Sequence, residues 1–309
     1  MRIKFLKLFM FLFVVTPLMA QQIYHVDASI AASGDGSSKE QAFKTINEAV
    51  AATPEANEIW IYEGLYSDSP IDVTGMGSPT SRLLFFGAED GVIINASGII
   101  FQGTSGAYDA FIEVRNMSFF STGTFAEYCD VVFRSGSIDV DNYVHISTAN
   151  GIEKFVGYDL QVLCNRGSYH FYNGGTELYN ASILSVANQT SAARLIAIQA
   201  IGPKRVVLEN VFWSGAGSTA GDPYLFSADG HRPDTGYIKH LRFTALDTTG
   251  FGASGVTLTD ATGEDIGATF DGYPNFRYKL PSTSSAHNAG SYRTTIGFLK
   301  GTTGVFVGK

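Results

Sequence analysis

Short apolar runs, each centred on one Asn or Asp, recur along the chain from residue 90 onward. They occupy residues 93–101, 114–120, 157–163, 178–184 and 208–213. The central residues Asn95, Asn116, Asp159 and Asn180 are 21, 43 and 21 residues apart, so a further one is expected near Asp139 or Asn142. A period of 21–22 residues is typical of a β-solenoid, in which each coil is two or three short strands joined by turns. Asn or Asp at the same turn of each coil predicts a side-chain ladder along one edge.

The segment Ile23–Tyr66 has a different pattern from the repeat. It begins with a short alternating strand and a Gly/Ser-rich turn, and ends with a second strand and a Gly turn. Between them we expect a helix over 42–53, because Phe43, Ile46, Ala49 and Val50 recur at helical spacing. Such a helix can lie flat over the first coil, which would otherwise expose apolar side chains and unpaired backbone groups.

Two longer intervals interrupt the repeat. The next central residues are Asn210 and His240, each 30 residues after the one before. Each interval therefore holds an insertion of roughly nine residues, expected within 186–203 and 214–236. Inserted loops leave the stack on one face and commonly wall a groove, so we expect a functional site nearby.

Both ends of the repeat resemble a known family. In the first segment, Tyr-x-Val-Asp, Phe-x-Thr-Ile-x-x-Ala-Val and Ile-x-Ile-x-x-Gly-x-Tyr are similar to the N-terminal cap of secreted parallel β-helix proteins of the pectate-lyase-like superfamily. Residues 278–299 resemble the family's closing phrase at Leu280, Ser284, Ala286, Ala289, Gly290, Ile296, Gly297 and Phe298. The resemblance implies an all-β, single-stranded right-handed parallel β-helix, a solenoid with an N-terminal α-helical cap. The expected domain comprises a cap at 23–66, coils over about 67–270 and a closing segment over about 271–309, which would cover the far end.

Residues 1–20 read as a signal peptide, with a basic start, a short apolar run and a small-residue cleavage site. We therefore expect a secreted or cell-surface protein without a membrane span. Without this segment, 18 Lys and Arg stand against 29 Asp and Glu, a net charge of −11. No basic cluster suits a nucleic-acid partner. Cys129 and Cys164 are 35 residues apart, not a whole number of coils, which favours two buried thiols over a disulfide.

The family includes polysaccharide lyases, uronate epimerases, esterases, hydrolases and proteins without known activity. A lyase or epimerase removes a proton next to a uronate carboxyl, and needs a base and a cation (Ca²⁺, Arg or Lys) to stabilise the intermediate. The first candidate group is His145 and Arg166, 21 residues apart, with Asn188 22 residues further, and Lys154, Tyr158 and His170 in the same coils. The alternative interpretation is that these are solvated exterior positions.

The second candidate group lies in the second insertion, Asp229-Gly-His231-Arg232-Pro-Asp234. His231 and Arg232 are assigned a catalytic role with His145 and Arg166, and Asp229 and Asp234 a substrate-binding role. The alternative is a loop held by its own Arg–Asp pairs. Trp213 is a candidate for stacking on a sugar ring, although a core position is equally open.

The sequence thus supports three functions. The first is a lyase or epimerase acting on an acidic, uronate-containing polysaccharide. The second is a non-catalytic surface or secreted β-helix that binds glycan or protein, and the third is an adhesin- or fibre-like structural module. No metal-binding signature is present, and Ca²⁺ is the one cofactor that the lyase interpretation would favour.

Overall fold

The chain was studied as a computed structural model, which describes residues 22–53, 57–89, 91–147, 153–164, 169–185, 194–198, 205–215, 224–226, 233–244, 256–263, 269–271 and 277–279. These residues are mostly β-structure, with parallel strands and one short helix. In chain order the elements are β1 (Ile23–Val26), α1 (Ile46–Ala52), β2 (Glu58–Ile61), β3 (Gly64–Tyr66), β4 (Ile71–Asp72), β5 (Leu83–Gly87), β6 (Val92–Ala96), β7 (Phe101–Gln102), β8 (Phe111–Ser121), β9 (Ala126–Glu127), β10 (Asp130–Val140), β11 (His145–Ile146), β12 (Lys154–Cys164), β13 (Tyr169–Asn173), β14 (Gly175–Tyr179), β15 (Ser182–Ser185), β16 (Arg194–Ile198), β17 (Arg205–Gly215), β18 (Tyr224–Phe226), β19 (Thr235–Thr244), β20 (Val256–Gly263), β21 (Thr269–Asp271) and β22 (Arg277–Lys279).

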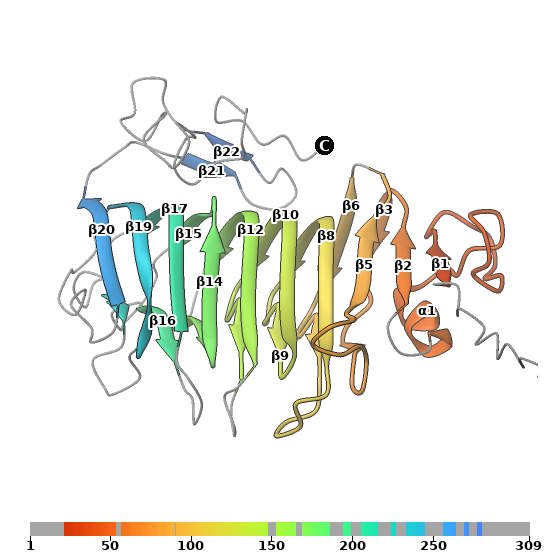
Figure 1. Ribbon diagram of the computed structural model, residues 1–309. Helices are drawn as coiled ribbons and strands as arrows, with labels where there is room; N and C mark the ends of the chain where they lie inside the picture. The colour runs from red at the N-terminus through yellow and green to blue at the C-terminus, as the bar shows by residue number, and fades with distance from the viewer. Residues whose placement is uncertain are drawn as a thin grey trace, which may run out of the picture.

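Two parallel sheets run side by side along the molecule (Figure 1). The long sheet has the order β1-β2-β5-β8-β10-β12-β14-β17-β19-β20, with β3, β6 and β15 also pairing in it. The second sheet has the order β4-β7-β9-β11-β13-β16-β18. Because the chain alternates between the sheets and each strand pairs with the corresponding strand one coil later, the strands form a stack of coils. The predicted parallel stacking is confirmed.

A left-handed residue divides the long strands into a first and a second half. Asn116, Ser135, Asp159, Asn180, Asn210 and His240 share one register position, with φ between 50° and 59°. We call these six residues the pivots. Asn210 Nδ2 donates to Asn180 Oδ1 at 2.9 Å, and Asn180 Nδ2 donates to Asp159 Oδ1 at 3.1 Å. Asn and Asp tolerate this backbone conformation better than other residues with a Cβ. The predicted ladder is therefore confirmed over these three coils.

Two members of the predicted ladder were wrong. Asn95 is paired in register with Phe120 of β8, four residues beyond the pivot Asn116, so it lies in another column. The pivot between Asn116 and Asp159 is Ser135, not Asp139 or Asn142, which lie further along the same coil. Sequence spacing missed Ser135 because it is neither Asn nor Asp and because the two coils beside it differ in length, with 19 residues from Asn116 to Ser135 and 24 from Ser135 to Asp159.

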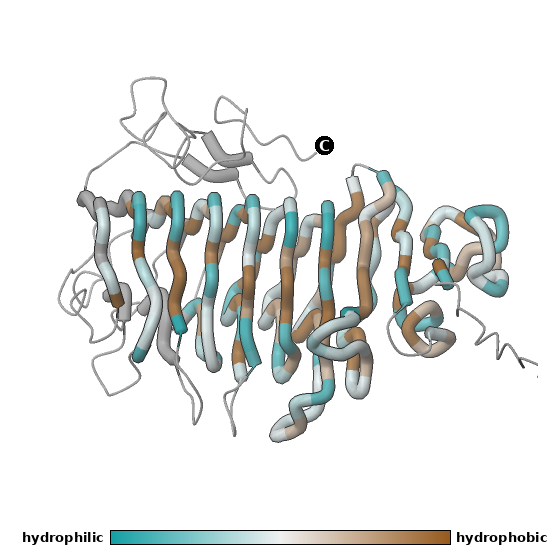
Figure 2. Tube along the Cα trace, viewed as in Figure 1, coloured by the Kyte–Doolittle hydropathy of each residue, from teal (hydrophilic) through white to brown (hydrophobic). Residues whose placement is uncertain are grey.

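The core lies between the two sheets. Its largest fully buried side chains are mainly Phe, contributed by both sheets. Phe119, Phe125, Phe133 and Phe155 meet edge-to-face with ring centroids 5.0–6.3 Å apart. Such pairs stabilise a fold beyond their area burial. Figure 2 shows hydrophobic residues along the middle of the strands and hydrophilic residues toward the turns.

The helix α1 lies beside β1, β2 and β4 at the end of the stack where the chain begins (Figure 1). It starts at Ile46, later than predicted, because Thr45 is its N-cap and forms a reciprocal capping box with Glu48. Ile46, Ala49 and Val50 are buried as expected. The preceding loop covers the free edge of β1: His25 N donates to Gly36 O, and Phe43 N donates to His25 O.

Both cysteines are buried free thiols, as predicted. No helix in the described part of the chain is long and apolar enough to cross a membrane. The predicted signal peptide lies outside the described residues, as do the insertions apart from strands β16, β17, β18 and the start of β19, and the closing segment apart from Asp271 and β22.

Candidate functional site

His145 is not on an outer face, so its predicted catalytic role has no surface to act on. Its side chain is fully buried in β11. Nε2 lies 2.6 Å from Cys129 O, and Nδ1 lies 2.9 Å from Asn173 Nδ2. A neutral ring that donates from Nε2 and accepts at Nδ1 satisfies both contacts. Burial lowers the pKa of His145, more than its bond to Cys129 raises it, which also favours the neutral ring.

The expected stacking of His145 on Arg166 was also wrong, because the register between the coils differs from the predicted one. The residue that follows His145 in the next coil is Phe171 of β13, an inward-facing core residue. His170 is also fully buried, 6.4 Å from the Trp213 ring, and burial lowers its pKa to about 4. Trp213 is itself fully buried, so it cannot stack on a sugar from outside. These three residues belong to the core.

Three of the other predicted site residues reach the surface. Lys154 and Tyr158 lie on β12, partly exposed, and Asp234 is exposed just before β19. Arg166, Asn188, Asp229, His231 and Arg232 lie outside the described residues. The structure thus tests neither the second candidate loop nor the face assigned to Arg166, and their roles stay predictions.

Lys154 and Tyr158 belong to a larger surface, formed by the first halves of the long strands. Side chains there alternate between the core and the outside, as in β12, where buried Phe155 and Gly157 separate partly exposed Lys154, Val156 and Tyr158. Parallel register stacks the outward side chains into columns. We call this surface the outer strip; its polar and aromatic members include Trp60, Phe86, Glu113, Arg115, Arg134, Lys154, Tyr158, Glu177, Tyr179, Arg205, Glu209, Tyr237 and Lys239.

Near the middle of the outer strip, two arginines share one carboxylate. Arg115 Nε lies 2.6 Å and Arg134 Nε 2.7 Å from Glu113 Oε1. Burial alone would raise the pKa of Glu113, but the hydrogen bonds from both guanidinium groups outweigh it, so the pKa is lowered. Glu113 is therefore ionised at neutral pH, and the pair of arginines leaves one positive charge in excess. Their side chains are 46% and 43% exposed, which leaves further N–H donors open to solvent.

A tyrosine stack continues the strip. The Tyr158 and Tyr179 rings are nearly parallel, with centroids 4.9 Å apart, and the Arg134 guanidinium lies 4.4 Å from the Tyr158 ring centroid. Both faces of the Tyr158 ring are thus covered, one by a cation and one by a ring. Tyr158 therefore presents its edge and hydroxyl outward, and no open ring face.

Paired charges extend the strip to β19. Arg205 Nε lies 2.9 Å from Glu177 Oε1, and Lys239 Nζ lies 3.6 Å from Glu209 Oε1. From β8 to β19 the named members of the strip include five basic and three acidic residues, whereas the whole chain has 21 basic and 29 acidic. The outer strip therefore concentrates positive charge in an acidic protein.

An aromatic patch forms the other end of the strip. Trp60 of β2 and Phe86 of β5 are register partners on the outside of the sheet, with ring centroids 5.5 Å apart at 66°. Trp60 Nε1 donates to Glu58 at 3.0 Å, which fixes the indole. Both rings are partly exposed.

The second sheet also carries an outward column, which begins at the exposed Asp72 and includes Glu127. Glu127 lies between Gln102 and Ile146 in register, half-buried. Burial raises the pKa of Glu127, and a hydrogen bond from Thr124 offsets part of that rise. A carboxyl of this kind can hold a proton more readily than an exposed one, which is a property of acid catalysts.

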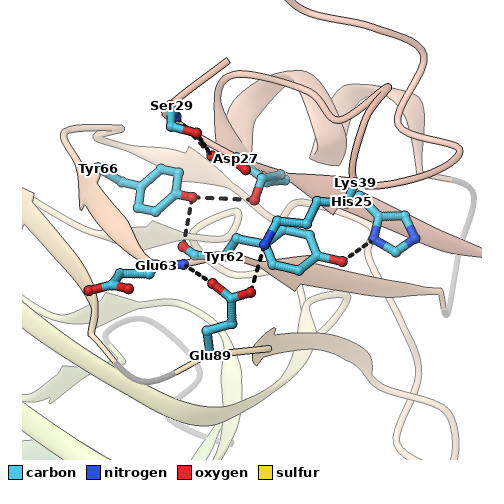
Figure 3. Close-up of polar contacts among 9 residues, drawn as sticks. His25, Asp27, Ser29, Lys39, Tyr62, Glu63, Tyr66 and Glu89 are labelled. Carbon is cyan, nitrogen blue, oxygen red and sulfur yellow. Dashed lines mark hydrogen bonds and ion pairs between the residues drawn. The ribbon is translucent and has the colours of Figure 1, made fainter.

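A third polar cluster lies at the beginning of the stack (Figure 3). Lys39 Nζ contacts Glu89 Oε1 at 2.6 Å and lies 4.1 Å from the Tyr62 ring centroid, while the Tyr62 hydroxyl lies 2.9 Å from His25 Nδ1. The Tyr66 hydroxyl donates to Tyr62 O, and burial raises its pKa to about 12. Because these groups bind one another and the backbone, the cluster fastens the Gly/Ser-rich loop to the first coils.

No group of three or more His, Cys, Asp or Glu within the described ranges is arranged to hold a metal ion.

Comparison with known proteins gives little more. No protein-family model and no curated protein matches the chain. One similar solved structure is the crystal structure of pectate lyase Pel9A, with a TM-score of 0.37 and 14% identity over 92% of this chain and 88% of that one. A likeness this remote supports no argument about function.

Sequence reasoning missed most of the outer strip because its members show no motif. Glu113, Arg115 and Arg134 are close only through the register of β8 and β10. One signal was available: the residue just before each pivot is charged or aromatic in every coil from Arg115 to Lys239. Aligning the coils on Ser135 as well as on Asn and Asp would have exposed that column.

Proposed function

We propose that the protein is an exported right-handed parallel β-helix, capped by α1, that binds an acidic polysaccharide along the outer strip. The observation that carries the proposal is one column of outward side chains, from Trp60 to Lys239, in which every residue except Glu209 is basic or aromatic. A stack of coils repeats its outward groups about every 4.8 Å along its axis. A linear polymer lying along that axis can therefore meet equivalent groups in successive coils.

The polar chemistry of the strip favours uronate units. Arg115 and Arg134 keep exposed N–H donors after pairing with Glu113, and guanidinium groups bind carboxylates through paired hydrogen bonds. The hydroxyls of Tyr158 and Tyr179 and the carboxylates of Glu177 and Glu209 would orient sugar hydroxyls. The Trp60 and Phe86 rings offer an apolar surface for the C–H face of a sugar.

Catalysis as a lyase or epimerase is the second candidate, and one observation favours it. Lys154 and Tyr158 lie on β12, the strand next to β10, and Arg134 of β10 lies beside Tyr158. An arginine that neutralises the uronate carboxylate and a lysine or tyrosine that accepts the adjacent proton are the two groups the reaction needs. Binding alone needs fewer assumptions, because it requires no general base on the strip.

The test uses the secreted form, residues 21–309, and a panel of polymers. Polyuronates and uncharged glucans are compared by isothermal titration, and unsaturated products are followed by absorbance with Ca²⁺ and with chelator. The proposal predicts affinity for a polyuronate, weakened by salt and absent for uncharged glucans. Product formation would establish the lyase. Equal binding to charged and uncharged polymers, or no binding, would contradict the proposal.

A further inference from the structure

The outer strip changes character along the stack. The outward residue just before the pivot is Arg115 in β8 and Arg134 in β10, but the same column holds His25, Trp60 and Phe86 in the three strands before them. We call these three residues the aromatic section and the two arginines the cationic section. Because Phe86 and Arg115 are register partners, the two sections are directly adjacent.

The rings of the aromatic section form one chain of contacts. The centroids of Phe86 and Trp60 are 5.5 Å apart, and those of Trp60 and His25 are 6.0 Å apart. His25 is nearly parallel to the Tyr62 ring at 5.8 Å, and Lys39 Nζ lies 4.1 Å from the centroid of that ring (Figure 3). Tyr62 thus already packs against an imidazole and a cation. The aromatic surface left to a ligand belongs mainly to Trp60 and Phe86, which are partly exposed.

The aromatic section differs from the cationic section in charge as well. The outward positions of β1, β2 and β5 are Ile23, His25, Glu58, Trp60, Leu84 and Phe86, with no Lys or Arg among them. Burial lowers the pKa of His25, so its ring is neutral at neutral pH. Glu58 Oε2 accepts a hydrogen bond from Trp60 Nε1 at 3.0 Å, which places a carboxylate at the edge of the indole. A uronate over Trp60 would therefore meet a like charge.

Two cations close to these coils are bound to carboxylates of the protein. Lys39 Nζ lies 2.6 Å from Glu89 Oε1, over the Tyr62 ring. Arg82, just before β5, extends to β10, where its guanidinium binds the carboxylate of Asp130 and donates to its backbone oxygen at 2.9 Å. The excess positive charge at this end of the strip therefore lies at the cationic section.

The aromatic section suits an uncharged sugar. The C–H face of a sugar packs on an aromatic ring without needing a charge on either partner. Successive coils are about 4.8 Å apart, a distance comparable to the length of one sugar unit. A linear chain along the strip would therefore place neighbouring units on Phe86 and Arg115. A uronate at Arg115 meets guanidinium groups that bind its carboxylate, whereas the unit on the rings needs no carboxylate at all.

We propose that the ligand is an acidic heteropolysaccharide in which uncharged sugars adjoin uronates. Trp60 and Phe86 bind the uncharged units, and Arg115 and Arg134 bind the uronate. Glu58 sets the preference, because it disfavours a second carboxylate over the indole. This inference rests on the proposed binding of a polysaccharide to the outer strip, and it specifies which class of polymer the strip selects. Stacking on two rings contributes modestly by itself, so an uncharged glucan is held too weakly to bind.

Titration of residues 21–309 with two contrasting ligands tests the proposal. Gellan fragments carry a single uronate within a run of uncharged sugars, whereas oligogalacturonate carries a carboxylate on every unit. The wild type should bind gellan fragments more tightly than oligogalacturonate of equal length. Trp60→Ala should weaken gellan binding about fivefold or more and change oligogalacturonate binding less than about twofold. Glu58→Gln keeps an acceptor for the indole N–H but removes the charge, so it should strengthen oligogalacturonate binding about threefold at low salt, and less as salt is raised.

Leu65→Ala is the matched control, because Leu65 is an apolar side chain that is 57% exposed on β3, outside the strip, and its loss should change neither affinity. Urea denaturation shows whether each variant is folded; should Trp60→Ala not fold, Trp60→Phe and Glu58→Gln carry the test. The proposal is overturned if the wild type prefers oligogalacturonate, if the Trp60 variant affects both ligands alike, or if Glu58→Gln leaves the oligogalacturonate affinity unchanged. A wild type that binds neither ligand would overturn the proposed function itself, and this inference with it.

Discussion

The two halves of each long strand belong to one backbone run but have opposite surroundings. In β12, the first half alternates strictly, with outward Lys154, Val156 and Tyr158 partly exposed, whereas outward Gln161 and Leu163 of the second half are buried. The pivot Asp159 separates them. In β12 one left-handed residue therefore separates an open first half from a buried second half, whereas in β10 the outward Val132 of the first half is buried as well.

Exposed and buried positions of the strands also differ in the kind of side chain they carry. Open positions carry charges that pair with each other yet keep contact with water, such as Arg134 with Glu113. Closed positions carry apolar groups or small polar groups with few water contacts. The predicted histidine site failed for this reason: His145 and His170 have the chemistry of a catalyst but the surroundings of the core.

The largest expected difference between the two halves of β12 is their tolerance of a new carboxylate. Leu163→Asp should destabilise the fold by about 3–5 kcal/mol, because it buries a charge without a partner. Val156→Asp, outward on the same strand but partly exposed, should cost less than about 1 kcal/mol. Urea denaturation of both variants measures the difference. Equal losses would mean that the second half is not covered.

Replacing the buried histidine sharpens the division between core and strip. His145→Ala removes a packed ring and leaves Cys129 O and Asn173 without their partner. We expect a loss of roughly 3 kcal/mol in unfolding free energy, with affinity for a polyuronate unchanged. Denaturation and titration on the same preparation check both parts. Intact stability with lost turnover would restore His145 as a catalytic residue.

The pivots connect the two halves, so their conformation should contribute to stability. Asn180→Ala keeps the left-handed backbone but loses the bonds to Asp159 and Asn210, and should cost about 1–2 kcal/mol. Asn180→Gly loses the same bonds but relieves the backbone cost, so it should be milder than Asn180→Ala. Thermal unfolding ranks the variants, and a Gly variant worse than Ala would contradict the assigned backbone conformation.

The buried histidines predict a modest loss of stability in mild acid. Burial lowers the folded pKa of His145 and lowers that of His170 to about 4, whereas both are near 6.5 when unfolded. The unfolded chain therefore binds more protons below pH 6.5, and stability should fall as the pH drops from about 6.5 toward 4. His170→Phe should flatten that slope in denaturation measured at several pH values. An unchanged slope would mean that His170 is exposed to solvent.

Much of the fold was predictable from sequence because it depends on local pattern. Thr45 and the apolar stripe specify α1, and Asn180 and Asn210 mark their turns through a conformation that few residues tolerate. Because the coils differ in length, sequence spacing did not identify Ser135 as a pivot. The column of outward residues just before the pivots, which ends at Lys239, was therefore missed too. Which face a side chain takes depends on register between coils, and that register was misjudged for His145, which pairs with Phe171 rather than Arg166.

The central claim is that the outer strip binds an acidic polymer through its basic column. The most direct measurement is the affinity of residues 21–309 for a polyuronate, by titration at low and moderate salt, for the wild type, Arg115→Ala/Arg134→Ala and Lys44→Ala. Lys44 is an exposed cation on the N-terminal loop, off the strip, and serves as the matched control. We predict that the double variant binds at least tenfold more weakly, with a smaller salt dependence, while the Lys44 variant matches the wild type. Equal affinities for all three proteins would contradict the account.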